Sequence, residues 1–207
     1  SIKKGGEIIP PTGTPMLLEI TTTYENTEIT LPHLDGYNYD YTVDYGDGTI
    51  LSVTSYDDVN CTHIYTTPGV YTLSINGTCE TFYVNWSDIS FSITKILQWG
   101  DVGIILPNFG GCSILTEITN DTYSGLTNVT TFEYSFSETL ISEIPTGLFD
   151  NCTSTTNFYG TFRDCSSLTS IPTDLFKYNT QVSTNGFQST FQNCTSLLSI
   201  PTDLFRY

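Results

Sequence analysis

Cysteine and histidine are among the side chains of this chain that could supply a metal site, a redox pair or a nucleophile. The six cysteines form no C-x-x-C pair, and the two histidines are His33 and His63. Zinc ribbons and thioredoxin-type sites need such pairs, so neither is expected. The sequence also contains no G-x-S-x-G, H-E-x-x-H or Walker motif. These features favour a protein that is not an enzyme and uses no metal or cofactor, although paired catalytic carboxylates would leave no motif.

Two cysteines, Cys61 and Cys79, flank a predicted hairpin and could face each other across it. A disulfide between them would fit an oxidising compartment. Two unpaired thiols in the core are the favoured alternative. The remaining cysteines lie in the second half, at Cys112, Cys152, Cys165 and Cys194. For these we expect small buried side chains whose thiols donate weakly to turn carbonyls, in preference to a metal or redox ladder.

Several aspartates of the first half could offer oxygen ligands to Ca²⁺, which binds several oxygens at once. They are Asp40, Asp44, Asp47, Asp57 and Asp58. The EF-hand spacing is absent, so we favour turn residues and a solvated strand face. His63 could be a metal ligand, but its place in an H-x-Y sequence favours a hydrogen-bonded core histidine.

The composition favours β-structure with an acidic surface. The chain has 207 residues, a net charge of −16, no alanine, 14 tyrosines and 12 phenylalanines. Aromatic residues and threonine favour strands, whereas alanine is the best helix former. So few basic residues argue against nucleic acid and against an anionic membrane surface as partners. No apolar run is long enough to span a membrane, so we expect no membrane insertion.

The first half is patterned as strands. From Tyr37 to Tyr45 apolar and polar residues alternate, which places the tyrosines and Val43 on one face. Gly46-Asp47-Gly48-Thr49 predicts a turn after this strand. A second hairpin is predicted from residues 61–65 and 70–75 around Thr67-Pro68-Gly69, and a further strand from Glu80 to Val84.

This segment resembles a polycystic-kidney-disease (PKD) domain. The resemblance rests on Asp44-Tyr45-Gly46-Asp47-Gly48-Thr49, on His63-Ile64-Tyr65 and on Pro68-Gly69-Val70-Tyr71-Thr72-Leu73. Val43 stands where that family usually has tryptophan, so a weaker core is expected at that point. The resemblance implies an immunoglobulin-like β-sandwich that acts as a spacer or binding module outside cells.

The second half contains a repeat. Residues 162–176 align with residues 191–205 at an offset of 29, and residues 136–149 form a third copy with one residue missing. A degenerate first copy begins at Phe109. A period of this length with leucine and isoleucine at fixed offsets is typical of a leucine-rich solenoid. Each copy should contribute one short parallel strand, near Leu168 to Ile171, with phenylalanines filling the core between coils.

The pattern F-x-x-C-x-x-L-x-x-I-P-x-x-L-F resembles the BspA-type leucine-rich repeats of bacterial surface proteins. Together the two resemblances predict a mainly β protein in three parts: a flexible leader (1–14), a PKD-like sandwich (15–90) and a leucine-rich-repeat solenoid (91–207). No polar cap is visible after the last copy, so we expect the solenoid to be truncated at its C-terminal end.

The exposed face of the stacked strands is the predicted binding surface, because solenoids commonly bind partners there. Its outward positions are Glu117, Glu143, Thr169, Ser170, Leu198 and Ser199. The alternative is a merely solvated face.

Three functions are compatible with these features. The first is a non-enzymatic adhesion protein, extracellular or on a cell surface, which binds a protein or glycan through its repeats. The second is a structural component of a virion or extracellular filament, which could self-assemble. It is motivated by the lack of an apolar secretion-signal segment after Ser1-Ile2-Lys3-Lys4-Gly5, for which removal of the signal is the other explanation. The third is an accessory region of a larger secreted glycan-degrading enzyme.

Overall fold

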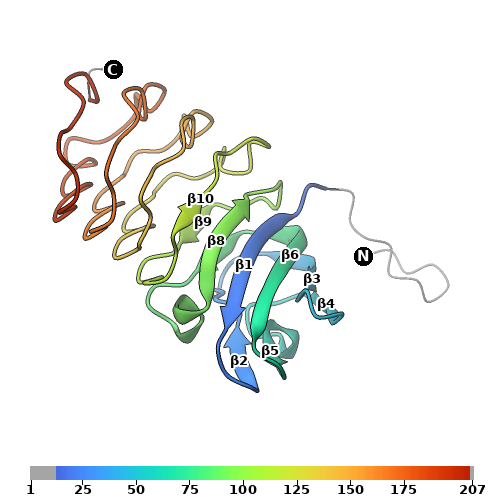
Figure 1. Ribbon diagram of the computed structural model, residues 1–207. Coiled ribbons are helices and arrows are strands. Elements are labelled where there is room, and N and C mark those ends of the chain that lie inside the picture. Colours follow the sequence, from blue (N-terminus) through green and yellow to red (C-terminus); the bar gives the residue numbers. More distant parts are fainter. Residues whose placement is uncertain (1–12, 206–207) are drawn as a thin grey trace.

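The computed structural model describes residues 13–205. The predicted leader therefore lies outside the described residues except for Gly13 and Thr14. The described part is mainly β and contains two short 3-10 helices, η1 (Val59–Cys61) and η2 (Asp88–Phe91), but no α-helix. Figure 1 shows a sheet followed by successive turns of chain that stack one behind another toward the C-terminus.

The largest sheet has six strands in the order β10-β8-β1-β6-β3-β4. Their bounds are β1 (Met16–Thr22), β3 (Tyr39–Asp44), β4 (Ile50–Val53), β6 (Gly69–Cys79), β8 (Ile93–Gln98) and β10 (Glu117–Ile118). Two smaller sheets consist of β2 (Thr27–Thr30) with β5 (Thr62–Tyr65), and of β7 (Thr81–Tyr83) with β9 (Leu106–Asn108).

The alternating strand of the first half is confirmed. Tyr39, Tyr41, Val43 and Tyr45 are buried, while the residues between them are at least partly exposed. The predicted turn also forms, since β3 pairs antiparallel with β4 and the amide of Tyr45 donates to the carbonyl of Thr49. Strand β7 coincides with the strand expected after Glu80. Alternation at period two thus placed one face of β3 in the core.

The second predicted hairpin is wrong. Strand β5 pairs with β2, and β6 pairs with β1 and β3, so β5 and β6 belong to different sheets. The Thr67-Pro68-Gly69 segment therefore passes from one sheet to the other. A turn signal between two strand patterns indicates a change of direction, but it does not tell which neighbour each strand will pair with.

The six-stranded sheet runs across residue 90, where the sequence divides. Strand β8 pairs antiparallel with β1, and β10 then pairs parallel with β8. Trp99 follows β8; it is buried, and its indole N–H donates to the carbonyl of Thr119, 2.9 Å away. The buried side chains of both halves form one hydrophobic cluster, so the sheet and the stack share a core.

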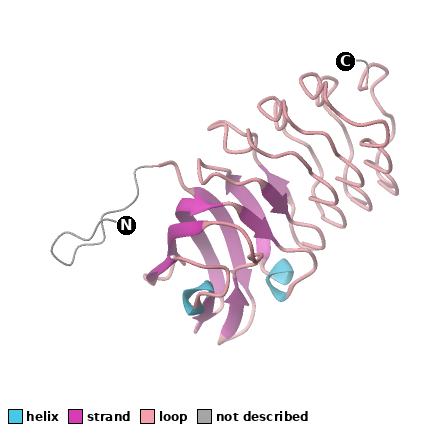
Figure 2. Cartoon of the chain, turned by 180° about the vertical axis from the view of Figure 1, so that it is seen from behind, coloured by secondary structure: helices cyan, strands magenta, loops and turns pink. Residues whose placement is uncertain are grey.

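Beyond β10 the chain forms stacked turns joined by backbone hydrogen bonds. The amide of Phe132 donates to Asn157 at 2.8 Å, and the amide of Phe158 donates to Gly186 at 2.6 Å. The predicted short strands shrink here to isolated parallel bridges, Thr131 with Asn157 and Glu143 with Ser170. Figure 2 shows these turns from behind as loops without strand arrows.

Phenylalanine rings hold the turns together. They form three rows along the stack: Phe109, Phe136, Phe162 and Phe191; Phe132, Phe158 and Phe187; and Phe149, Phe176 and Phe205. Within each row neighbouring ring centroids lie 5.4 to 6.3 Å apart, with planes tilted by 14° or less. Each ring inside a row therefore packs on the ring one turn before it and on the ring one turn after it, whereas a ring at the end of a row has one such neighbour.

Two positions of the repeating turn recur in the left-handed conformation. One position is occupied by Gly111, Glu138, Asp164 and Asn193, with φ between 58° and 79°, and the other by Tyr134, Gly160 and Ser189, with φ between 52° and 59°. Glycine, asparagine and aspartate tolerate this region best, which accounts for several of these residue types. The recurrence bends every turn in the same way.

Candidate binding surfaces

We use the name strand face for the six predicted outward residues, all of which are exposed in the structure. Glu117 lies on β10, in register with Lys95 of β8, and Glu143 bridges Ser170 one turn further on. Thr169 is tied to the preceding turn, because both its amide and its hydroxyl donate to the carbonyl of Ser142. Glu143 and Ser170 thus lie on neighbouring bridged turns, and Glu117 lies on the turn before them.

The last two residues of the strand face are less constrained. Leu198 is 95% exposed. No backbone hydrogen bond joins Leu198 or Ser199 to the preceding turn within the described chain. Glu117, Glu143, Thr169 and Ser170 therefore lie on three successive turns that backbone hydrogen bonds join, whereas Leu198 and Ser199 follow on the last described turn.

The strand face is acidic near β8. The ammonium group of Lys95 lies 3.7 Å from a carboxylate oxygen of Glu19 and 3.7 Å from one of Glu117. One lysine thus serves two carboxylates, and Glu143 adds a further negative charge one turn along. This surface suits a partner that is neutral or basic there.

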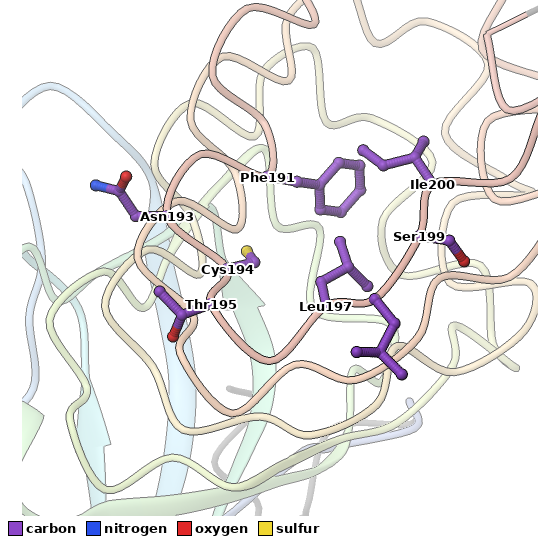
Figure 3. Close-up of a pocket in the computed structure, with 8 residues that line it drawn as sticks. Phe191, Asn193, Cys194, Thr195, Leu197, Ser199 and Ile200 are labelled. Atoms are coloured by element: carbon purple, nitrogen blue, oxygen red, sulfur yellow. The ribbon is translucent and has the colours of Figure 1, made fainter.

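The end of the stack is hollowed. A cavity of about 340 Å³ is lined by Phe191, Asn193, Cys194, Thr195, Leu197, Leu198, Ser199 and Ile200. Figure 3 shows the side chains of Phe191, Leu197 and Ile200 pointing into this hollow and that of Asn193 pointing away from it. The lining residues belong to the interior of the last described turns, which is open here because no further turn of the structure packs on it.

A second concavity, which we call the junction groove, was not predicted from the sequence. Its volume is about 510 Å³, and its lining residues are Leu34, Tyr83, Asn85, Leu106, Asn108, Thr131, Glu133 and Tyr134. The residues come from the loop before β3, from β7, from β9 and from the next turn of the stack. Tyrosines at outward positions were the only sequence signal for this groove. The fold was needed to bring Leu34 close to residues that lie about 50 to 100 positions later in the chain.

The floor of the junction groove is fixed by Asn108. This buried side chain accepts hydrogen bonds from the amides of Asn85 (3.2 Å) and Gly110 (3.0 Å), and it donates to the carbonyl of Glu133 at 3.4 Å. The loop on the opposite side is fixed as well, because the hydroxyl of Tyr39 bonds both the amide and the carbonyl of Leu34. The groove is therefore preformed.

The two cysteines of the predicted disulfide meet the same imidazole. Cys61 Sγ lies 3.4 Å from His33 Nδ1, and Cys79 Sγ lies 3.7 Å from His33 Nε2. Both cysteines are free and buried in the structure, and their disulfide stays a prediction. Burial raises the pKa of the Cys61 thiol to about 11 and also raises that of Cys79, so neither is an activated thiolate at neutral pH. Burial lowers the pKa of His33 to about 4.

Two repeat cysteines make the contact expected of them. Cys165 Sγ donates to the carbonyl of Phe136 at 3.0 Å, and Cys194 Sγ donates to that of Phe162 at 3.1 Å. Each thiol therefore links its own turn to the preceding one. All four repeat cysteines are buried, and burial raises the pKa of each.

Three of the five aspartates considered for calcium accept hydrogen bonds within turns and loops, whereas Asp40 lies on β3. The carboxylate of Asp44 accepts from the amide of Gly46, that of Asp58 accepts from the amides of Thr54 and Asn60, and that of Asp57 accepts from a serine hydroxyl. Among residues 13–205 no group of three histidine, cysteine, aspartate or glutamate side chains is arranged to hold a metal ion.

His63 is hydrogen-bonded, as predicted. Its Nε2 lies 2.8 Å from Asp47 Oδ2, its side chain is 11% exposed, and its ring stacks on that of Tyr45 at 4.2 Å. Burial would raise the pKa of Asp47, but hydrogen bonds from Thr49 and His63 outweigh it and hold this pKa below its ordinary value. The pair joins the β3–β4 turn to β5.

The comparisons with known proteins add no relative. No protein-family model, curated protein or solved structure matches this chain. In the part of the chain that the structure describes, no helix has the length and apolar character needed to cross a membrane.

Proposed function

We propose that this chain is a non-enzymatic binding protein of an extracellular or cell surface, with an immunoglobulin-like head of the PKD type and a BspA-type leucine-rich-repeat solenoid. The proposed partner is a protein or glycan, and the proposed binding surface is the strand face. Supporting the solenoid are three rows of phenylalanines, each repeated once per turn, and parallel backbone hydrogen bonds between turns.

The observation that carries the binding role is the alignment of the strand face. Glu117, Glu143 and Ser170 lie on successive turns, are exposed, and are supported from behind by buried isoleucines at the next position of each turn. Side chains on a rigid ladder lose little conformational freedom when a partner binds. A broad, regular surface of this kind suits an extended partner.

The test is binding of the purified protein to immobilised extracellular-matrix proteins and to a broad glycan array. We expect at least one partner in these sets, and a weaker signal for the variant Glu117→Gln/Glu143→Gln. Glu25→Gln is the control, because Glu25 is exposed in the turn between β1 and β2, away from the strand face. Absence of binding to every matrix protein and every glycan tested would contradict the proposal.

A further inference from the structure

We propose that the junction groove binds a neutral carbohydrate chain. This inference rests on the proposed binding function, but it concerns a different surface from the strand face. It follows from the size of the groove, its rigidity, its charge and the side chains that line it.

The size and rigidity of the groove suit a small ligand unit. Its volume of about 510 Å³ falls within the ~300–1,000 Å³ usual for ligand sites. Its floor and its loop wall are fixed by Asn108 and by the Tyr39–Leu34 hydrogen bonds. A ligand would therefore meet a preformed surface and would spend little binding free energy on ordering it.

The side chains offer both flat apolar faces and hydrogen-bonding groups. Tyr83 and Tyr134 contribute partly exposed aromatic rings, and Leu34 and Leu106 contribute apolar surface. The hydroxyl of Tyr83 and the carboxamide of Asn85 have no hydrogen-bond partner among residues 13–205, so both are available to a ligand. A sugar ring presents the matching chemistry, with C–H faces that pack on aromatic rings and hydroxyls that both donate and accept.

The charge of the groove points to a neutral ligand. No lysine or arginine is among the lining residues. The guanidinium of Arg163 lies beside the hydroxyl of Tyr134, but it is paired with the carboxylate of Asp164 at 3.1 Å. Phosphate, sulfate and uronate groups therefore meet no unpaired positive charge there. Its one carboxylate belongs to Glu133, and that group already accepts a hydrogen bond from the carboxamide of Asn157 at 3.2 Å. A strongly cationic ligand would therefore meet a single, partly engaged charge.

Strand addition by a peptide is disfavoured at the same place. Strand β7 is paired with β9 on one side, and on the other the amide of Tyr83 donates to the carbonyl of Pro32 at 2.8 Å. Without free backbone groups a peptide loses the main-chain hydrogen bonds that give strand addition its affinity. A ligand must therefore be recognised by the side chains of the groove, and these side chains suit the hydroxyl groups of a sugar.

The repeat itself supplies variants that should fold. Tyr134 occupies the left-handed position that holds Gly160 one turn later and Ser189 two turns later. Tyr134→Gly therefore removes a wall of the groove without backbone strain. Asn85 also has a positive φ of 40°, so Asn85→Gly removes its carboxamide while keeping the amide that Asn108 binds. Ser189→Gly makes the same backbone change far from the groove and is the matched control.

The test is isothermal titration with neutral tetrasaccharides (cellotetraose, laminaritetraose, mannotetraose and chitotetraose) and with anionic tetragalacturonate. We expect the wild type and Ser189→Gly to bind at least one neutral tetrasaccharide with equal affinity and not to bind tetragalacturonate. Tyr134→Gly and Asn85→Gly should each bind at least about tenfold more weakly, as for central contact residues.

The outcomes separate this inference from the proposed function. No heat with any neutral tetrasaccharide, or unchanged affinity in Tyr134→Gly, overturns the groove assignment. If a tetrasaccharide is lost only in Glu117→Gln/Glu143→Gln, the sugar binds the strand face, and the proposed function stands without the groove. If a matrix protein binds and no sugar does, the inference fails alone.

Discussion

Truncating Phe162 should destabilise the protein far more than truncating Phe191, although both residues occupy the same position of the repeating turn. Phe162 is fully buried and stacks between Phe136 (5.4 Å) and Phe191 (5.6 Å). Phe191 is partly exposed, and in its row it has a neighbour on one side. The pair of variants therefore compares an interior ring with a terminal ring in the same chemical setting.

The magnitudes follow from burial. Removing a buried phenylalanine costs about 3–5 kcal/mol. Each aromatic pair adds roughly 0.5–1.5 kcal/mol beyond area burial, and Phe162→Ala loses two pairs within its row where Phe191→Ala loses one. We expect a loss of about 4 kcal/mol for Phe162→Ala and about 2 kcal/mol for Phe191→Ala. Phe162→Leu keeps most of the volume and should cost about 1.5 kcal/mol.

The assay is urea-induced unfolding followed by circular dichroism, with hydrogen exchange of the last turns measured in parallel. Because stacked repeats can lose cooperativity, Phe191→Ala should also speed exchange in residues 180–205 while leaving β1 and β6 protected. Equal losses of unfolding free energy for the two alanine variants would refute the reasoning. They would mean that packing on neighbouring turns does not determine how much each ring contributes to the stability of the protein.

Three further changes test other parts of the structure. Burial lowers the pKa of His33 to about 4 in the folded protein, so as the pH falls this histidine is protonated in the unfolded chain before it is protonated in the folded one. The free energy of unfolding should therefore drop by up to about 3 kcal/mol between roughly pH 6.5 and pH 4. His33→Gln should flatten that drop in chemical denaturation at several pH values, and an unchanged slope would exclude His33 as its source. Ser189→Gly should be neutral or stabilising by about 0.5 kcal/mol, because φ is 59° there, and a lowered melting temperature would count against the left-handed position. Gly125→Ala should cost about 2 kcal/mol or more, because the new Cβ would lie 2.1 Å from the carbonyl oxygen of Gly100; full stability in thermal melting would contradict this close approach.

The parts of the fold that depend on periodicity could be predicted from the sequence. Alternation from Tyr37 to Tyr45 placed a buried face on β3, and the repeat period placed Phe162 and Phe191 in equivalent, stacked positions. Side-chain direction in these segments follows from local spacing alone. The six predicted outward residues are exposed for the same reason, and their role in binding stays a prediction.

Pairing between distant segments could not be predicted in the same way. Nothing local to β5 indicates that its partner is β2, more than 30 residues earlier, and nothing local to β8 indicates that it pairs with β1. The junction groove was missed for a related reason, because Leu34 and Glu133 meet only after the sheet and the stack have joined. The contact of His33 with both Cys61 and Cys79 likewise depends on three segments that the sequence keeps apart.

The central place of β1 in its sheet affects how the protein would respond to tension. All seven of its residues are paired with β6, and its other edge carries β8. A load pulling along β1 from its amino end would act parallel to both neighbours, so many hydrogen bonds would have to break at once instead of one after another. A protein anchored through that end would therefore resist extension by fluid drag until the sheet yielded.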